Sequence, residues 1–322
     1  MLSLPDFKEK QIVMCFCNEG QKMLFRNDNM IVADIDGKII VQITCYKIFA
    51  LFVAGSTSIT TGILERSKKF RFPIVFMSYS LRVTGVWTNG VDGNFLLRQK
   101  QYEYKDLSIA RYLVQNKIYN QLQLIKTIRD KDQKIKSAVE NLKNYCGDPA
   151  NINNLDQLLG CEGLASRVYF KAWFGERWQM RRPRTKIDTI NTCLDIGYTI
   201  LFNIIDAMLS VYGFDLYKGV YHREFYQRKS LVCDLVEPFR VIIDKALKKA
   251  FNLGQIKDEF FKIEDARYIL RSEHSKDLSK IFMSAILEYK EDIFLYMQKY
   301  YRAFMQGRDL SEYPVFVFKG ED

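Results

Sequence analysis

Residues 219–240 read GVYHREFYQRKSLVCDLVEPFR, and the rest of the chain can be interpreted outward from this stretch. Apolar residues on both sides of Asp234 predict a packed helix, which Pro238 should kink or break because proline lacks a backbone donor. Asp234 and Glu237 are three residues apart and therefore share a helical face. His222 precedes Asp234 by twelve residues and lies in a loop-like segment. A histidine and two acids that converge can hold a divalent cation.

Each of these residues also has a plainer interpretation. Two acids near the start of a helix are favoured by the helix dipole on a solvated face, and a lone histidine is more often a packing residue than a ligand. The other histidine, His274, lies in a polar stretch and receives no role. A third acid for a metal must come from elsewhere, and the candidate is Glu162, a single acid in the small, apolar stretch 158–170. Alone, Glu162 is typical of an acid near a helix N-terminus.

The charge balance favours a polyanionic partner. Lysine and arginine number 48 against 38 acids, which gives a net charge of +10 and a sequence pI of about 9.1. Nucleic acid fits this balance, and ordinary surface charge is the alternative. The segment 177–186 gathers five cations around Trp178 and Pro183, which suits contact with phosphates but also describes an exposed basic loop without a partner. These candidate DNA-binding residues are Arg177, Arg181, Arg182, Arg184 and Lys186.

Several classes of protein are disfavoured by what the sequence lacks. The seven cysteines form no CxxC pair, so reduced core thiols in a cytosolic protein fit better than disulfides or a zinc site. No GxxxxGK[ST] occurs, which disfavours nucleotide hydrolysis. The first residues are polar where a signal peptide would be apolar, and the apolar run 198–214 contains Asn203 and Asp206. We therefore expect a cytoplasmic protein with a buried helix in 198–214 and no membrane partner.

The pattern of apolar residues divides the chain into two parts. Residues 11–95 are mostly typical of β-structure, and after about residue 100 the period changes from 2 to 3.6. The expected strands are 12–17, 30–33, 39–43 and 74–77, with one helix at 60–69. The expected helical regions are a stripe that begins at residue 109, then 152–174, 187–213, 230–251, 258–270 and 276–306. We predict an α+β protein with a small β-rich domain at 1–95, a linker at 96–104 and a larger all-helical catalytic domain at 105–322.

In the order and spacing of these residues, nearly the whole chain resembles the CRISPR-associated spacer-acquisition integrases, the Cas-one family. The most specific part runs from residue 162 to residue 244. It contains Glu162 with SR at 166–167 and YF at 169–170, RRPR at 181–184, DTIN at 188–191, GY at 197–198, YGF at 212–214, GVYH at 219–222 and SLVCDLVEPFR at 230–240. The β-rich front half looks like the N-terminal dimerisation domain of that family.

The resemblance implies an active site. The family's metal ligands fall on Glu162, His222 and Glu237, and a further acidic position of its active site falls on Asp234. Two carboxylates and one imidazole suit Mg²⁺ or Mn²⁺. One departure is Asp195, where many members have Asn or Ser. We expect Asp195 to be a variation in packing or around the site that leaves the ligands intact.

The resemblance also implies a reaction and partners. The expected activity is that of a metal-dependent DNA integrase, in which the 3′-hydroxyl of an incoming duplex attacks a phosphodiester at the edge of a CRISPR repeat. The expected partners are double-stranded DNA (the incoming fragment and the CRISPR repeat), a second copy of the chain in a homodimer, and a dimer of a small protein of the Cas-two family. Two alternatives stay open: a metal-dependent endonuclease that hydrolyses branched DNA, and a non-catalytic nucleic-acid-binding scaffold.

Overall fold

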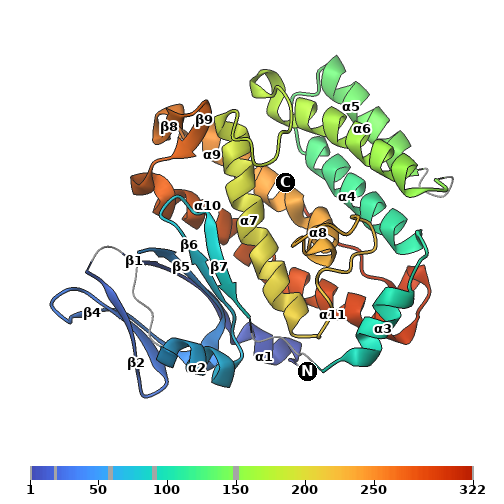
Figure 1. The fold of residues 1–322 in the computed structure, drawn as a ribbon. Coiled ribbons are helices and arrows are strands. Elements are labelled where there is room, and N and C mark those ends of the chain that lie inside the picture. The colour runs from blue at the N-terminus through green and yellow to red at the C-terminus, as the bar shows by residue number, and fades with distance from the viewer. Residues whose placement is uncertain (1, 18–19, 57–60, 89–92, 148–151, 321–322) are drawn as a thin grey trace.

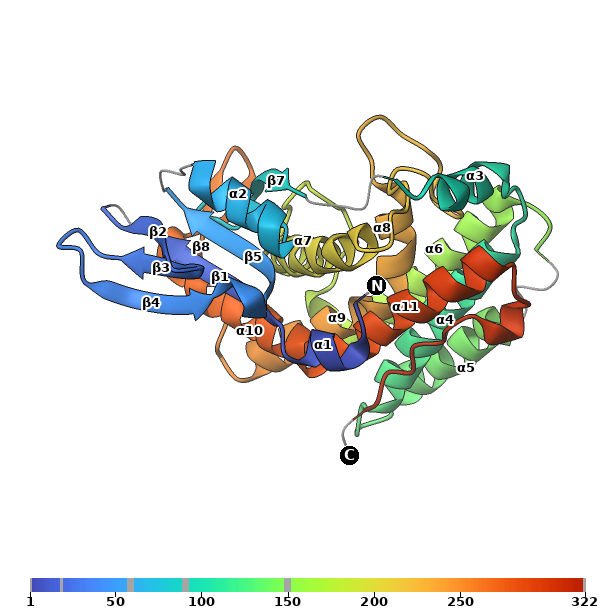
Figure 2. The same cartoon turned by 90° about the horizontal axis from the view of Figure 1, so that it is seen from below.

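A β-rich N-terminal region packs against a larger set of helices in the computed structural model of this chain (Figure 1). The structure describes residues 2–17, 20–56, 61–88, 93–147 and 152–320. The strands of the N-terminal region lie together at one end of the molecule, and most helices fill the other end (Figure 2). The predicted α+β class, a β-rich part followed by a mostly helical part, is confirmed.

The centre of the N-terminal region is a four-stranded mixed sheet in the order β1-β5-β6-β7. β1 (Gln11–Cys17), β5 (Ile48–Gly55) and β6 (Ile74–Met77) are parallel, and β7 (Val83–Trp87) is antiparallel to β6. A parallel pair needs a crossover connection, and α2 (Thr61–Phe70) lies in the connection between β5 and β6. All of β5 except its last residue is buried, so this strand is covered on both faces.

A second, smaller sheet covers one face of the first. β2 (Lys22–Arg26), β3 (Asn29–Ala33) and β4 (Ile39–Thr44) form an antiparallel meander. Neighbouring side chains of a strand point to opposite faces. Leu51 of β5 therefore enters a core shared with the meander and α2, whereas Phe52 enters the core shared with the helices. The four-stranded sheet is fixed between these two cores.

The helical part is built around α7 (Thr189–Ser210), which is buried along most of its length. Within the described residues, α7 is the one helix long and apolar enough to cross a membrane by length and composition, and 83% of its most apolar window is buried inside the fold. The buried helix predicted in 198–214 is confirmed as far as residue 210. The other helices are α1 (Leu4–Lys8), α3 (Phe95–Glu103), α4 (Ser108–Lys126), α5 (Gln133–Gly147), α6 (Leu155–Phe174), α8 (Ser230–Val236), the 3-10 turn η4 (Glu237–Phe239), α9 (Arg240–Asn252), α10 (Ser275–Glu288) and α11 (Lys290–Gln306).

Both ends of the described chain are anchored on helices. Phe7 of α1 stacks on Phe294 of α11, with ring centroids 4.1 Å apart. At the other end, Asn116 of α4 donates to the carbonyl of Phe316 at 2.7 Å and accepts from its backbone N–H at 3.0 Å. The backbone N–H of Phe318 donates to Asn120 Oδ1, one turn further along α4, at 2.8 Å. The C-terminal segment is thus docked on the helix that precedes α5.

One predicted helix, at 258–270, is wrong. The region forms a short 3-10 turn, η5 (Asp258–Phe260), and then a hairpin of β8 (Phe261–Glu264) and β9 (Arg267–Leu270). The two residues between these strands both have positive φ, as a tight two-residue hairpin requires. The larger part of the molecule is therefore mostly rather than wholly helical.

The predicted strands and the predicted N-terminal helix agree with the structure. The strands predicted at 12–17, 30–33, 39–43 and 74–77 are all present. The helix predicted at 60–69 is confirmed from residue 61, and residue 60 lies outside the described part of the chain. The residues predicted as a linker, 96–104, fall almost entirely within α3. One hydrophobic core joins residues of the sheet to residues of the helices, so the proposed domain boundaries stay a prediction.

Candidate active site

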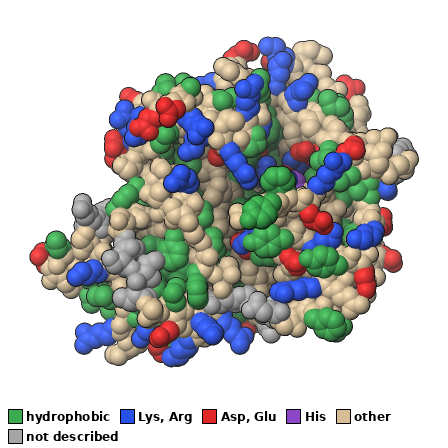
Figure 3. Space-filling view, viewed as in Figure 1, with side chains coloured by type: hydrophobic (Ala, Val, Ile, Leu, Met, Phe, Trp, Pro, Cys, Tyr) green, Lys and Arg blue, Asp and Glu red, His purple; other side chains and the backbone are tan. Residues whose placement is uncertain are grey.

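Four predicted site residues come from neighbouring elements of the helical part. Glu162 lies on α6, Asp234 lies on α8, and Glu237 opens η4. Pro238 breaks the helix as predicted, because α8 stops before η4 and α9 begins after it. His222 lies in the loop between α7 and α8. On the surface, a hollow beside α7 is rimmed by lysine and arginine side chains (Figure 3).

The buried carboxylate of Asp234 holds the histidine loop in place. Its Oδ2 accepts hydrogen bonds from the backbone N–H groups of Val220 and Tyr221 at 2.7 and 3.1 Å, and its Oδ1 accepts one from the backbone N–H of His222 at 2.8 Å. The same Oδ1 lies 2.7 Å from Nδ1 of the His222 ring. A Cβ at Gly219 would lie 2.6 Å from Asp234 Oδ2, so the close approach needs a glycine. The backbone of residues 219–222 therefore wraps around the carboxylate of Asp234.

These contacts decide which nitrogen of the imidazole is available. When Nδ1 of His222 donates to Asp234, the lone pair of the neutral ring lies on Nε2. That nitrogen lies 4.0 Å from Glu237 Oε1. A carboxylate on one ring nitrogen commonly orients a histidine whose other nitrogen binds a metal. Asp234 is fully buried, and its hydrogen bonds go to the histidine loop.

We expect Asp234→Ala to destabilise the fold by about 3 kcal/mol or more, because it leaves three backbone donors and an imidazole unpaired in a buried place. Urea unfolding of the variant and the wild type measures this difference. The matched control is Glu224→Ala, which removes an exposed acid of the same loop and should change stability by less than about 0.5 kcal/mol. Equal losses for the two variants would show that the loop holds its shape without Asp234.

A buried lysine joins Glu162 to Glu237. Lys117 extends from α4 with 7% of its side chain exposed; its ammonium donates a hydrogen bond to Glu162 Oε1 and lies 2.7 Å from Glu237 Oε2. Glu162 Oε1 also accepts a hydrogen bond from Ser166 Oγ at 2.9 Å. The other oxygen of Glu237, Oε1, lies 2.9 Å from the guanidinium of Arg240. Two cations thus neutralise two carboxylates in a largely buried cluster.

The two cations also determine the charge state of Glu237. Burial alone would raise the pKa of its carboxyl, but the nearby Arg240 and Lys117 lower the pKa to about 2. Burial likewise disfavours the charged form of Lys117, yet Glu162 and Glu237 hold the pKa of its ammonium above the usual value. Glu237 and Lys117 are therefore both ionised at neutral pH.

A further buried acid fixes the helix that carries Glu162. Asp244 of α9 accepts hydrogen bonds from Tyr169 of α6 at 2.7 Å and from Tyr198 of α7 at 2.5 Å. Its backbone carbonyl accepts one from Trp173 Nε1 at 3.0 Å. Burial raises the pKa of Asp244 to about 6 in spite of these donors. Three helices meet at this one residue, which sets the position of α6 relative to α9.

The donor atoms suit a hard divalent cation, although they are not gathered around one point. Among the residues that the structure describes, no group of three or more His, Cys, Asp or Glu is arranged to hold a metal ion as it stands. However, Glu237 Oε2 is buried and accepts no hydrogen bond of ordinary geometry within that part of the chain; its contact with Lys117 is an ion pair. A carboxylate oxygen whose partner is an ammonium, beside a second carboxylate and an imidazole, offers donor atoms that fit Mg²⁺ or Mn²⁺. The residues fit the ion provided that the ammonium gives way.

The predicted DNA-binding segment is a loop between α6 and α7 that is partly tied down. Arg181 pairs with Asp195 at 2.6 Å and donates to Asn191 at 2.9 Å, so only 18% of its side chain is exposed. Asp195 also accepts a hydrogen bond from the backbone N–H of Arg184 at 2.7 Å. The acid at position 195 therefore anchors the arginine loop. Of the other candidates, Arg177, Arg182 and Arg184 are exposed and Lys186 is half-buried.

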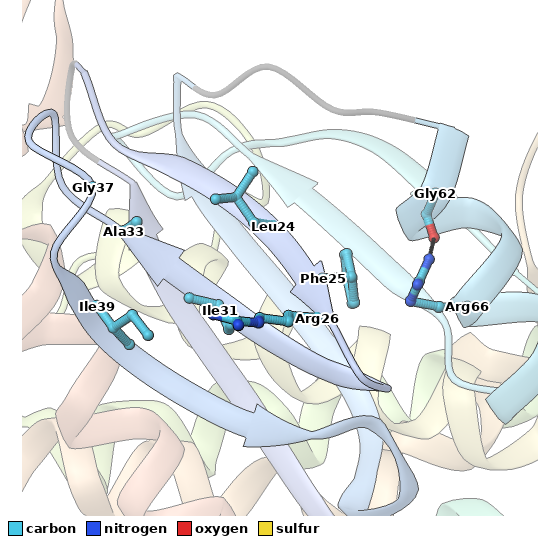
Figure 4. Close-up of a pocket in the computed structure, with 9 residues that line it drawn as sticks. All are labelled: Leu24, Phe25, Arg26, Ile31, Ala33, Gly37, Ile39, Gly62 and Arg66. Carbon is cyan, nitrogen blue, oxygen red and sulfur yellow. Dashed lines mark hydrogen bonds between the residues drawn. The ribbon is translucent and has the colours of Figure 1, made fainter.

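A separate hollow lies in the N-terminal region, between the meander and α2 (Figure 4). Arg66 of α2 lies there with its guanidinium 5.2 Å from the ring centroid of Phe25, and it donates to the carbonyl of Gly62 at 3.3 Å. None of the predicted site residues lines this hollow.

Lys117 and Arg240 are site residues that the sequence reasoning missed. Arg240 stands inside the motif that carries the resemblance, three residues after Glu237. Lys117 has a fainter signal, because it follows Leu113 by four positions and so lies on the buried stripe of its helix. A cation on a buried stripe requires an anion nearby. This requirement could have pointed to Lys117 as a partner of a buried acid.

Comparison with known proteins shows which family the chain resembles. The family model described as CRISPR associated protein Cas1 matches residues 16–284 of this chain. A CRISPR-associated endonuclease Cas1 of Thermodesulfovibrio yellowstonii is 31% identical over an alignment of 230 positions that covers 64% of this chain and 71% of that protein. The matched region includes every predicted site residue.

Two solved structures share the fold. A chain of a Cas6-RT-Cas1–Cas2 complex superposes with a TM-score of 0.80 at 23% identity and covers 97% of this chain, which spans 37% of that longer chain. A casposase bound to its integration product superposes with a TM-score of 0.75 at 17% identity, over 95% of this chain and 96% of the other. At these identities the likeness shows the fold alone, whereas the family model matches most of the sequence. The chain therefore belongs to the CRISPR associated protein Cas1 family.

Proposed function

We propose that this chain is a metal-dependent DNA integrase that inserts short duplexes into a CRISPR array. One observation carries the proposal: Glu162 and Glu237 share a single ammonium, and His222 lies beside Glu237 with its Nε2 free of the Asp234 contact. The casposase supports the proposal, because that structural neighbour was solved with an integration product. The net charge of +10 suits a DNA partner.

A divalent cation at this site would polarise the attacked phosphodiester and stabilise charge on the leaving 3′-oxygen. Glu162 and Glu237 would hold it through carboxylate oxygens and His222 through Nε2, while Asp234 keeps the imidazole in the required orientation. In the reaction, a phosphorus–oxygen bond to the donor 3′-oxygen forms as the bond to the 3′-oxygen of the repeat strand breaks. The number of phosphodiesters is unchanged, so no nucleotide hydrolysis is needed.

The direct test is an integration assay with the purified chain, a Cas2-type partner, a hydroxyl-ended labelled duplex and a plasmid that carries the repeat. Joined product should form in Mn²⁺ and should disappear when a chelator is added. The endonuclease is a second candidate, favoured by the printed name of the relative, and it would use water as the nucleophile at the same ligands. A chain that neither joins nor cuts DNA with any divalent cation would be the non-catalytic scaffold instead.

We propose that the DNA backbone contacts the loop between α6 and α7. Replacing the exposed Arg182 and Arg184 by Gln should weaken DNA binding and flatten the plot of log affinity against log salt, by about one unit of slope per lost contact. Arg181 is left unchanged because its guanidinium is engaged by Asp195. The control removes the same charge elsewhere, through Lys22→Gln and Lys38→Gln in the meander. If both double variants keep the wild-type slope, the loop arginines are ordinary surface residues.

Two protein partners belong to the proposal. The first is a second copy of the chain, bound through the meander, where four apolar side chains expose between 41% and 51% of their surface. These side chains are Leu24, Ile39, Ile40 and Val41. The second is a small protein of the Cas2 type, supported by the solved complex that contains both kinds of protein. A cytoplasmic location remains a prediction from the sequence.

A further inference from the structure

We propose that Lys117 is a built-in counter-cation that occupies the metal pocket in the metal-free protein and must be displaced before a divalent cation can bind. The inference rests on the metal site of the proposed function. The same two carboxylates that would bind the metal already bind the ammonium of Lys117.

The contacts of the two cations differ in a way that singles out Lys117. Lys117 contacts Glu237 at Oε2, whereas Arg240 contacts the same residue at Oε1. The oxygen that faces Lys117 lies 2.7 Å from its ammonium, so a cation already occupies the place where a metal would contact this oxygen. Arg240 can keep its own oxygen while the exchange occurs. The two cations thus contact different oxygens of Glu237, and only Lys117 also pairs with Glu162.

Charge balance also requires the exchange. Glu162 and Glu237 carry two negative charges, and the resting cluster already contains the positive charges of Lys117 and Arg240. A divalent cation added to this cluster would meet an ammonium within contact distance of both its carboxylate ligands, and like charges at that distance in a buried site repel strongly. Without any cation between them, the two carboxylates would repel each other. If the ammonium leaves when the metal enters, the two carboxylates have one cation between them both with and without the metal.

The fold lets the side chain move while its helix stays still. Residues on either side of Lys117 hold α4 to the C-terminal segment, through the paired hydrogen bonds of Asn116 with Phe316 and of Asn120 with Phe318. Lysine has a flexible four-carbon stem and a compact charge. In this proposal the displacement is a rotation of the Lys117 side chain, and α4 stays in place.

The test is the affinity of the DNA-free protein for Mn²⁺, measured by titration calorimetry and by electron paramagnetic resonance of the unbound ion. Lys117→Met should bind Mn²⁺ about tenfold more tightly than the wild type or better, because no ammonium competes. Lys117→Arg keeps a competing charge and should not tighten binding. The matched control is Lys229→Met, which removes another largely buried lysine from its pair with Asp206 and should leave Mn²⁺ affinity unchanged.

Thermal unfolding gives an independent readout. In a chelator, Lys117→Met should unfold at a lower temperature than the wild type, since Glu162 and Glu237 lose a partner. Saturating Mn²⁺ should raise its midpoint by more than it raises that of the wild type. If Lys117→Met does not fold in a chelator, refolding is tried with Mn²⁺ present and with Lys117→Gln. Failure of both variants to fold even with the ion would overturn the proposal, because Mn²⁺ should replace the ammonium.

The outcomes separate this inference from the proposed function. If the wild type binds Mn²⁺ and Lys117→Met binds it no more tightly, the lysine stays in place beside the metal and only this inference fails. If neither protein binds Mn²⁺, the inference and the metal-dependent function fail together. If only the variant binds measurably, or if it binds the more tightly, Lys117 is the competitor.

Discussion

Glu162→Ala and His222→Ala should each reduce strand transfer by on the order of a thousandfold in Mn²⁺, because each removes one ligand from an incomplete set of donors. Both side chains are partly exposed, at 20% and 17%, so their loss should leave the fold and DNA affinity largely unchanged. Labelled donor joined to a repeat-bearing plasmid measures the reaction. Near wild-type joining by either variant would remove that residue from the site.

Glu237→Ala should abolish strand transfer as well, both because a metal ligand is lost and because the fold is destabilised. Its carboxylate is 5% exposed and lies between Lys117 and Arg240, so its removal leaves Arg240 without this anion and leaves the buried Lys117 with Glu162 alone. Breaking a buried pair in this way costs about 3–5 kcal/mol of stability. Glu237→Gln keeps the volume and some hydrogen bonding and is the better variant for kinetics. Circular dichroism and urea unfolding show whether a given loss of joining comes with a loss of fold.

The sequence predicted the parts of this molecule that depend on local pattern. Pro238 had to interrupt a helix, and it does so at the point where Glu237 is needed. Asp234 and His222 were candidates by type and spacing, and the structure brings them within 2.7 Å through Nδ1 and Oδ1. Glu162 is different, because nothing in its spacing pointed to Glu237. Its place beside that residue follows from the packing of α6 against α4 and α9, and only the family resemblance selected it.

What the sequence did not predict depends on contacts between distant segments. Lys117 precedes Glu162 by 45 positions, and its role appears only once α4 packs beside α6 and η4. The strand β5 (Ile48–Gly55) has no counterpart among the predicted strands, because it is buried on both faces and shows no alternation. The segment 258–270 was predicted as a helix since short apolar runs are ambiguous, and its hairpin turn of two non-glycine residues with positive φ gave little warning.

A donor duplex that ends in 3′-deoxynucleotides should not be joined to the target, whereas the hydroxyl-ended duplex should be. The physical reason is that the proposed nucleophile is the donor 3′-hydroxyl itself, so its removal deletes the attacking atom and should lower joining to background. Glu162, His222 and Glu237 would serve a water nucleophile equally well, which is why their geometry does not separate an integrase from a nuclease.

The measurement compares joined and cut products on a labelled repeat-bearing plasmid with the two donors, in Mn²⁺ and with a Cas2-type partner present. Glu162→Ala serves as the control for contaminating nuclease, since it should give neither product. Joining that persists with the blocked donor would rule out attack by the 3′-hydroxyl. Cutting of the target to the same extent with either donor, and no joining with the hydroxyl-ended one, would mean that water is the nucleophile. In that case Glu162, His222 and Glu237 would serve a hydrolase, and Lys117 would compete with the metal of a nuclease.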